Sequence, residues 1–230
     1  LNKSQSSCST PYDYTPPCPP VLEVEEDCAQ EIDLLSWIGA HECADDVMGY
    51  VLYWAPFEGD TLQQYAVFDF VESGELDSTF IFNEENSEGT IAGCFAVTAL
   101  DSLLVGPSGE MRRNESEFSN IVCVDNCPFY FLPNVFTPNE DLLNDTFIPF
   151  QWKFIQSIDL VIYNRWGTEV FKTDDPNINW DGSHFVTGED LPDGVYFYTL
   201  IANTIRLDGI VPEKFSGEIQ ILGSRNSIVE

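Results

Sequence analysis

The fold is decided by Ile158-Asp159-Leu160-Val161-Ile162-Tyr163, which is followed at once by Asn164-Arg165-Trp166-Gly167. The first run is rich in β-branched and aromatic side chains and favours a strand, and the second is a turn-forming cluster. Pro192-Asp193-Gly194 is another turn, because proline presets φ, aspartate hydrogen-bonds its own backbone and glycine takes a positive φ. Val195–Ile201 again has strand composition, and Phe215–Leu222 alternates like a half-buried last strand. The sequence therefore predicts a small β-sandwich here.

Composition allows packed cores despite the extreme acidity of the chain. The 230 residues carry a net charge of −30, but 43% are hydrophobic and 13% aromatic, which argues against disorder. The length fits one or two domains of roughly 100 to 150 residues each. The charge is uneven, because only Lys3, Arg112 and Arg113 are basic in the first 128 residues. We expect both halves of the chain to fold.

The charge also limits the kinds of partner. Nucleic acid is excluded, because phosphate backbones need a cationic footprint that this sequence does not offer. An anionic membrane surface would repel the first half of the chain, and no run of 18 apolar residues predicts a membrane-spanning helix. Solvation of the surface is the simpler interpretation of the acidic residues. Binding of a divalent cation is the alternative.

Four ordered blocks in the last hundred residues resemble one family, the gliding-motility-associated C-terminal domain. This is the type B sorting domain of cargo exported by the type IX secretion system of Bacteroidota. The resemblance covers roughly Phe129 to Leu222. The blocks are Leu132-Pro133-Asn134-Val135-Phe136-Thr137-Pro138-Asn139, Leu160-Val161-Ile162-Tyr163-Asn164-Arg165-Trp166-Gly167, Asn179-Trp180-Asp181-Gly182 and Leu191-Pro192-Asp193-Gly194-Val195-Tyr196-Phe197-Tyr198.

The resemblance implies a signal for export and no catalysed reaction. It implies recognition by the type IX outer-membrane translocon and its type B-specific β-barrel partner, followed by retention at the outer-membrane cell surface or release outside the cell. Further copies of the chain are another possible partner. No enzyme activity is expected, since the histidines, His41 and His184, are not accompanied by a nucleophile elbow.

The preceding segment, residues 20–126, resembles a fibronectin type III domain. Short strands at intervals of about ten to fifteen residues, separated by turn signals, independently predict an all-β sandwich. The residues that carry the resemblance are Pro19-Pro20-Val21-Leu22-Glu23-Val24, Ile32-Asp33-Leu34-Leu35-Ser36-Trp37, Gly49-Tyr50-Val51-Leu52-Tyr53-Trp54, Cys94-Phe95-Ala96-Val97-Thr98-Ala99-Leu100-Asp101 and Glu115-Ser116-Glu117-Phe118-Ser119-Asn120.

The predicted organisation is therefore two tandem β-sandwiches. Residues 1–19 are expected to be the end of a preceding repeat and a proline-rich linker, residues 20–127 the fibronectin type III-like domain, and residues 128–230 the sorting domain. The chain begins at Leu1 without a signal peptide, so we expect it to be the C-terminal part of a longer exported surface protein of adhesin, gliding or appendage type. Two alternatives stay open: a glycan- or cell-binding adhesin module, or the tail of a hydrolase whose catalytic domain lies upstream.

Seven cysteines predict disulfides in an oxidising compartment. The fibronectin resemblance places Cys94 at the start of the sixth strand and Cys123 at the end of the seventh, which implies that they pair. Two more bridges are expected among Cys18, Cys28, Cys43 and Cys127, with Cys28 to Cys43 as one option. Cys8 is the candidate for the unpaired cysteine. Zinc binding through the closely spaced pair Cys123 and Cys127 is the competing interpretation.

A calcium site is possible in the loop Asn139-Glu140-Asp141-Leu142-Leu143-Asn144-Asp145. The family resembled usually has Asn-Gly-Asp-Gly-x-Asn-Asp here, and the oxygens of Asn139, Asp141, Asn144 and Asp145 are of the kind that Ca²⁺ prefers. Glu140 and Leu142 replace the two glycines, so the sharp turn is in doubt. A hydrogen-bonded Asx-type turn is the alternative. The tryptophans Trp37, Trp54, Trp166 and Trp180 are expected to pack in cores and turns rather than to form a carbohydrate platform.

Overall fold

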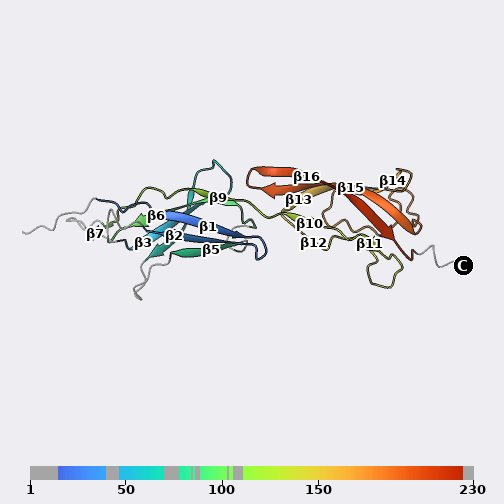
Figure 1. Cartoon of the computed structure of the whole chain (residues 1–230), viewed down its shortest axis with the longest axis horizontal. Coiled ribbons are helices and arrows are strands. Elements are labelled where there is room, and N and C mark those ends of the chain that lie inside the picture. Colours follow the sequence, from blue (N-terminus) through green and yellow to red (C-terminus); the bar gives the residue numbers. More distant parts are fainter. Residues whose placement is uncertain are drawn as a thin grey trace, which may run out of the picture. The chain divides into compact units, whose positions relative to one another are not determined.

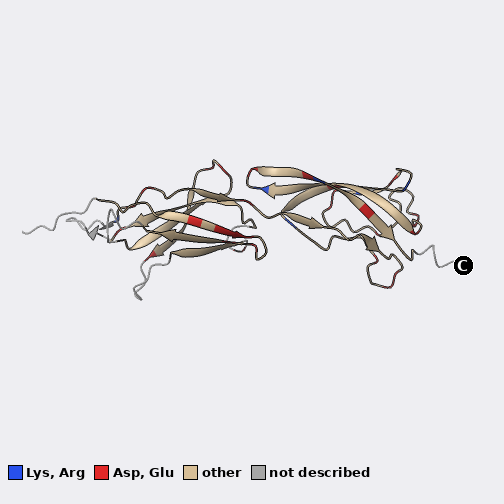
Figure 2. Cartoon of the chain, in the orientation of Figure 1, with Lys and Arg blue, Asp and Glu red and all other residues tan. Residues whose placement is uncertain are grey.

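The computed structural model describes residues 15–39, 47–69, 78–83, 85, 89–102, 104–105 and 111–224. All the regular elements in these ranges are strands, which confirms the all-β prediction (Figure 1). No helix in them is long and apolar enough to cross a membrane. The chain divides into two compact units, unit 1 (Leu1–Val124) and unit 2 (Asp125–Glu230). Acidic residues are spread over both units, and Lys and Arg are sparse (Figure 2).

Unit 1 is a sandwich of a three-stranded and a four-stranded antiparallel sheet. This arrangement is that of the fibronectin type III-like fold that the sequence predicts. The first sheet has the order β1-β2-β5 and the second β4-β3-β6-β9, with a small ribbon of β7 and β8 beside them. The strands are β1 (Val21–Asp27), β2 (Ile32–Ile38), β3 (Gly49–Ala55), β4 (Gln63–Asp69), β5 (Thr79–Asn83), β6 (Gly93–Leu100), β7 (Leu104–Val105), β8 (Met111–Arg112) and β9 (Val122–Val124).

Apolar residues on the facing sides of the two sheets form the core of unit 1. Trp37 of β2 is only 2% exposed and packs edge-on against Tyr50, with ring centroids 5.8 Å apart. Phe82 and Phe95 are fully buried and lie 4.8 Å apart across the sandwich. β6, which lies between β3 and β9, is buried along its whole length.

Asp33 is a charged residue type buried in this unit. It is 0% exposed, and neither of its carboxylate oxygens has a hydrogen-bond partner among the described residues. Glu26 is its cross-strand partner on β1. Burial, and to a smaller extent the charge of Glu26, raises the pKa of Asp33 from 3.8 to about 7. Near neutral pH this side chain is therefore divided between its charged and neutral forms.

The raised pKa predicts that unit 1 loses stability as the pH rises. Because the pKa of Asp33 is higher in the folded chain, its contribution is complete below about pH 4 and is lost as the pH rises through about 7. We expect the free energy of unfolding of unit 1 to fall by about 2 kcal/mol across this window. That is about half of what the full shift would give, because relaxation of the protein around a buried charge lowers the effective penalty. Asp33→Asn should remove most of the fall.

Urea unfolding at several pH values, followed by amide signals of unit 1, measures this dependence. Glu23→Gln, which removes an exposed carboxylate from β1, is the matched control. It should keep the pH dependence of the unaltered chain. Equal pH dependence in Asp33→Asn and in the unaltered chain would show that Asp33 does not titrate in this range.

Unit 2 is a second sandwich, which consists of a short two-stranded sheet and a five-stranded sheet (Figure 1). The five-stranded sheet has the order β11-β16-β15-β13-β14, in which only the β11–β16 pair is parallel. The strands are β10 (Phe129–Phe131) and β12 (Gln151–Lys153) in the short sheet, and β11 (Val135–Phe136), β13 (Ile155–Tyr163), β14 (Glu169–Thr173), β15 (Gly194–Arg206) and β16 (Gly209–Ile221) in the other.

The hairpin of β15 and β16 is longer than the sequence predicts. The two strands stay in register from Gly194 opposite Ile221 to Arg206 opposite Gly209. The strand pattern in the sequence is weakened by Asn203, Thr204 and Pro212. Backbone pairing between β15 and β16 nevertheless continues across these residues. The Thr204 hydroxyl donates to the Val211 carbonyl at 2.8 Å, so a polar residue is satisfied inside the hairpin.

The turn of this hairpin also explains where unit 2 begins. The Asp125 carboxylate accepts a hydrogen bond from the Leu207 N–H at 2.7 Å and lies 3.5 Å from the Arg206 guanidinium. Asn126 donates to the Ile205 carbonyl at 3.2 Å. The division therefore lies between Val124 and Asp125, whereas the sequence placed it after Cys127.

Candidate functional site

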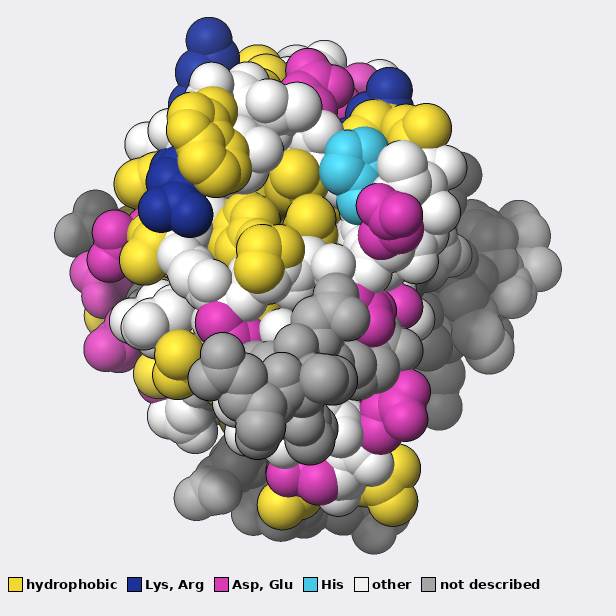
Figure 3. Space-filling model, turned by 90° about the vertical axis from the view of Figure 1, so that its right-hand side faces the viewer, with side chains coloured by type: hydrophobic (Ala, Val, Ile, Leu, Met, Phe, Trp, Pro, Cys, Tyr) yellow, Lys and Arg dark blue, Asp and Glu magenta, His cyan; other side chains and the backbone are white. Residues whose placement is uncertain are grey.

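All four sequence blocks of unit 2 meet at one end of its five-stranded sheet, which we call the motif end. Register places Tyr163 at the end of β13 opposite Phe197 near the start of β15. It also places Gly194 opposite Ile221 at the end of β16, and Ile221 beside Phe136 of β11. Segments that are far apart in the sequence thus lie at the same end of the sheet. Figure 3 looks onto this end, where hydrophobic side chains gather with Lys and Arg beside them.

An aromatic cluster underlies the motif end. Trp180 is 1% exposed and fills its centre, with its ring 5.3 Å from Phe136 and stacked 5.4 Å from Phe171. Phe147 and Tyr196 complete the cluster around the same indole. The Trp180 Nε1–H donates to the Ser183 carbonyl at 2.8 Å, which satisfies its polar atom. Phe136, Trp180 and Tyr196 are therefore core residues that shape the site from below.

The loop after β13 carries Arg165 and Trp166 outward. Asn164 Oδ1 accepts hydrogen bonds from the N–H groups of Trp166 and Thr168, each at 3.0 Å. Gly167 takes the positive φ of +80° that closes the turn. The Arg165 guanidinium lies over the Trp166 ring at 4.5 Å. Trp166 lies in this turn, as expected, but it is 75% exposed and is therefore not a core residue.

The turn before β15 forms the other side of the site. The Tyr196 hydroxyl donates to the Pro192 carbonyl at 2.8 Å, and burial raises the pKa of Tyr196. The Asp193 carboxylate accepts hydrogen bonds from the N–H groups of Gly223 at 2.9 Å and Ser224 at 2.7 Å. The turn is thereby tied to the chain that leaves β16. A pocket of about 260 Å³ lies between the two loops, and its lining includes Arg165, Trp166, Pro192, Tyr196 and Phe197.

The remaining motif residues fix the backbone around the aromatic cluster. Gly182 has a φ of +81°, and a Cβ there would lie 3.1 Å from Pro138. Asp181 Oδ1 accepts from the Ser183 hydroxyl at 2.6 Å. The Asn134 carbonyl accepts from the Gln220 N–H at 2.8 Å, which holds β11 against β16. Pro133 lines a separate hollow with Asn134 and Phe136.

The loop from Asn139 to Asp145 is held by its own hydrogen bonds. The Asp145 carboxylate accepts from the N–H groups of Asn139, Glu140 and Leu142 at 3.0, 2.7 and 2.7 Å. Both carboxylate oxygens of Asp141 and Oδ1 of Asn139 also accept from donors of the loop. The Asn144 carbonyl accepts from the Thr137 N–H at 2.9 Å. This is the geometry of the Asx-type alternative, and the calcium site stays a prediction.

The two residues that replace glycines keep the backbone conformation of glycine. Glu140 and Leu142 have φ values of 65° and 70°, which cost a side chain about 1 kcal/mol or more. Leu142 is 91% exposed and has little packing to lose. We expect Leu142→Gly to raise the free energy of unfolding of unit 2 by up to about 1 kcal/mol. Urea unfolding checks this.

Leu143→Gly is the matched control for this substitution. Leu143 is the next residue and also exposed, at 69%, but its φ is not positive. Glycine there should lower the stability of unit 2, because it only increases the freedom of the unfolded chain. The explanation by backbone strain is wrong if both substitutions lower the stability equally.

Disulfides engage the described cysteines of the chain. Cys94 of β6 and Cys123 of β9 form a cross-strand disulfide with their Cα atoms 4.0 Å apart. Cys18, Cys28 and Cys127 are also disulfide-bonded, whereas Cys8 and Cys43 lie outside the described residues. Zinc binding through Cys123 and Cys127 is therefore overturned, because a zinc ligand must be a free thiolate.

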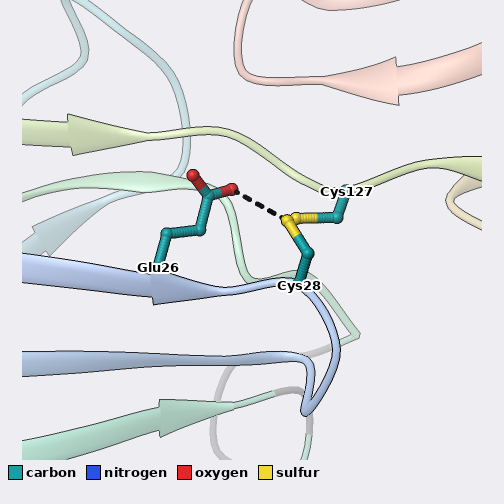
Figure 4. Close-up of side chains that lie close together, drawn as sticks. All are labelled: Glu26, Cys28 and Cys127. Carbon is teal, nitrogen blue, oxygen red and sulfur yellow. Dashed lines mark hydrogen bonds between the residues drawn. The ribbon is translucent and has the colours of Figure 1, made fainter.

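The acidic neighbour of Cys28 does not change this conclusion. Cys28 Sγ lies 3.7 Å from Oε1 of Glu26 (Figure 4). A disulfide sulphur carries no proton, so the approach is a contact and not a thiol hydrogen bond.

His184 is the histidine that the described part of the chain contains, and its contacts are local. His184 Nδ1 accepts from the Val186 N–H at 3.1 Å, and its ring stacks on Phe185. The other histidine, His41, lies outside the described residues. Arg113 forms an ion pair with Asp69 at the end of β4, so its charge offsets local acidity.

Comparison with known proteins gives one family. Residues 130–220 match the family described as the CHU_C type IX secretion signal domain. No curated protein matches the chain. Among solved structures, the crystal structure of the chicken CNTN1 FN1–FN3 domains is similar over 90% of this chain and 68% of that one, at 12% identity and a TM-score of 0.32. A type IX secretion signal implies interaction with the type IX machinery and export to the cell surface or the extracellular space.

Proposed function

Residues 130–220 form a type IX secretion signal domain, and from this premise we propose that unit 2 is the sorting and surface-retention module of a large Bacteroidota surface protein. It docks without a covalent step on the type IX outer-membrane translocon and its type B-specific β-barrel partner. The observation that supports this most strongly is the exposure of Trp166, at 75%, beside Arg165 at the motif end.

An exposed tryptophan stacked with an arginine is an unusual surface for a protein without a partner. Tryptophan and arginine are the side chains that most often dominate binding energy at interfaces. Here the turn of Asn164 fixes the backbone beneath them, so little conformational freedom is lost on binding. Val195 and Phe197, 43% and 47% exposed, extend the apolar area on β15. The motif end therefore has the chemistry of a preorganised docking surface.

Unit 1 fits the role of a spacer or stalk in this proposal. Its disulfide across β6 and β9 suits an oxidising exterior, and its acidity favours solubility there. The parent protein would be an adhesin or a gliding or appendage protein. Repeats of unit 1 upstream would support this class, and a catalytic domain upstream would instead identify the tail of an exported hydrolase.

Substitution at the motif end tests the docking proposal. Residues 1–230 are fused to a periplasmic reporter in a host with the type IX system, and the exported fraction is measured. We expect Trp166→Ala to lower that fraction at least about tenfold, because a hot-spot side chain contributes about 2 kcal/mol or more. Trp166→Phe should retain most of the export.

Phe57→Ala is the control, since Phe57 is an aromatic of unit 1 that is 47% exposed. It should leave export unchanged. Thermal melting of each purified variant verifies that unit 2 is folded. A folded Trp166→Ala variant that is exported like the unaltered chain would refute docking through the motif end.

A further inference from the structure

The outer edge of β16 is unpaired over most of its length. β11 pairs with β16 only at Gln220 and Ile221. Upstream of β11 the chain leaves this sheet, because β10 pairs with β12 instead. Among the described residues, no strand lies beside the edge from Gly209 to Ile219. An unpaired strand edge is a template for another extended chain.

The hydrogen bonds that are present show which backbone groups face this edge. The N–H groups of Gln220 and Leu222 point outward, to the carbonyls of Asn134 and Phe136. The Val211 carbonyl points the other way, to Thr204 of β15. The direction of the backbone N–H and C=O groups alternates from one residue to the next along a strand, so these groups face outward in the even-numbered residues of β16. The N–H and C=O groups of Lys214, Ser216 and Glu218 therefore lie on the open edge.

Pro212 supports this assignment and limits where a strand could add. It is also even-numbered, so the hydrogen-bond donor that proline lacks would have faced outward, where its loss does not weaken the β15–β16 pairing. A proline and an exposed lysine on an edge oppose unspecific pairing with other strands. The stretch from Lys214 to Glu218 remains as a short edge that a specific partner could use.

An apolar pocket lies next to this edge. It has a volume of about 200 Å³, and its lining includes Phe129, Tyr130 and Phe131 of β10 together with Phe215 and Glu213 of β16. Phe215 is 39% exposed and belongs to the odd-numbered side chains, which turn toward the short sheet. A strand added along Lys214–Glu218 would place alternate side chains on this same face. An apolar side chain of that strand would enter the pocket.

We infer that the edge Lys214–Glu218 and this pocket bind an extended segment of the type IX secretion machinery, which adds to the sheet as a sixth strand and inserts an apolar side chain. Backbone pairing would supply affinity, and the pocket would supply specificity. A second copy of this chain is the less suitable occupant, since each copy carries a net charge of −30. The inference rests on the proposed function but concerns a surface other than the motif end.

Hydrogen–deuterium exchange at single-residue resolution tests the inference on the full chain. The probe is the purified outer-membrane translocon with its β-barrel partner. In the complex, exchange of the Lys214, Ser216 and Glu218 amides should slow at least tenfold. The Gln220 amide, already bonded to Asn134, should change less than twofold. Unchanged exchange of the three edge amides in a formed complex overturns the inference.

Ser216→Pro provides a second test, because it removes an outward N–H group from the edge. It should weaken binding to the translocon at least tenfold, whereas Ser216→Ala, which keeps the N–H group, should bind within twofold of the unaltered chain. Equal binding by both variants overturns the inference. The exchange measurement needs no substitution, so it decides the question if Ser216→Pro does not fold.

The remaining outcomes separate this inference from the proposed function. If the unaltered chain does not bind the translocon, both fail. If it binds and the effect of Trp166→Ala persists while the edge amides stay unprotected, only the edge inference fails. Protection that appears in the chain alone and grows with its concentration would identify a second copy as the occupant. Protection independent of concentration would identify the chain's own residues. Either result overturns the inference.

Discussion

Trp180→Ala is expected to lower the free energy of unfolding of unit 2 by about 3–5 kcal/mol. The indole is 1% exposed and touches four other aromatic rings. Its removal leaves a cavity that Phe136 and Phe147 cannot fill without moving β11 and its neighbouring loop. The Nε1–H bond to Ser183 is lost as well. Urea unfolding followed by amide signals of β13 and β15 measures the change.

Trp166→Ala is the control for this substitution, because it makes the same chemical change in the same unit. Trp166 is 75% exposed, so its loss should change the stability of unit 2 by no more than about 0.5 kcal/mol. The two tryptophans are thus expected to divide their roles, one supporting the fold and the other export. Equal destabilisation by both substitutions would contradict this division.

Removal of the Cys94–Cys123 disulfide is the second large effect. The bridge joins paired residues of β6 and β9 and has a sequence separation of 29. A loop of this size constrains the unfolded chain by about 3–4 kcal/mol. We therefore expect the double variant Cys94→Ala, Cys123→Ala to lower the free energy of unfolding of unit 1 by about that amount, as measured by urea unfolding under oxidising conditions.

The amide signals of unit 2 serve as the internal control in this experiment. Their unfolding midpoint should not move, since both cysteines of the bridge belong to unit 1. A loss of stability in unit 1 below about 1 kcal/mol would mean that pairing of β6 with β9 restrains this part of the chain without the bridge. The prediction would then be wrong.

The strands of both units could be predicted from the sequence where composition and turns agree. The strand Ile155–Tyr163 includes the predicted run Ile158–Tyr163, which ends at turn residues. The strand Gly49–Ala55 includes Gly49–Trp54, which was predicted from its resemblance to a fibronectin type III strand. The pairing of Cys94 with Cys123 followed from fibronectin-like topology and is the pairing in the structure. These features depend on local patterns and on strand order, which a sequence carries directly.

The features that the sequence did not reveal depend on contacts between distant segments. Trp166 has the residue type of a core side chain, but it lies exposed in the turn that the Asn164 hydrogen bonds hold. The positive φ of Leu142 is imposed by the Asp145 carboxylate, which accepts its N–H. The open edge of β16 arises because β10 pairs with β12, and Pro212 is the residue within β16 whose type could have indicated an edge strand.

Export of a reporter by unit 2 alone tests the central claim most directly. Residues 125–230 are fused to a periplasmic reporter in a host with the type IX system, beside a fusion to a type B tail of known competence. We expect the reporter to reach the cell surface or the medium with both tails. A reporter that stays periplasmic with residues 125–230 while the reference tail exports it would contradict the assignment of unit 2 as a sorting module.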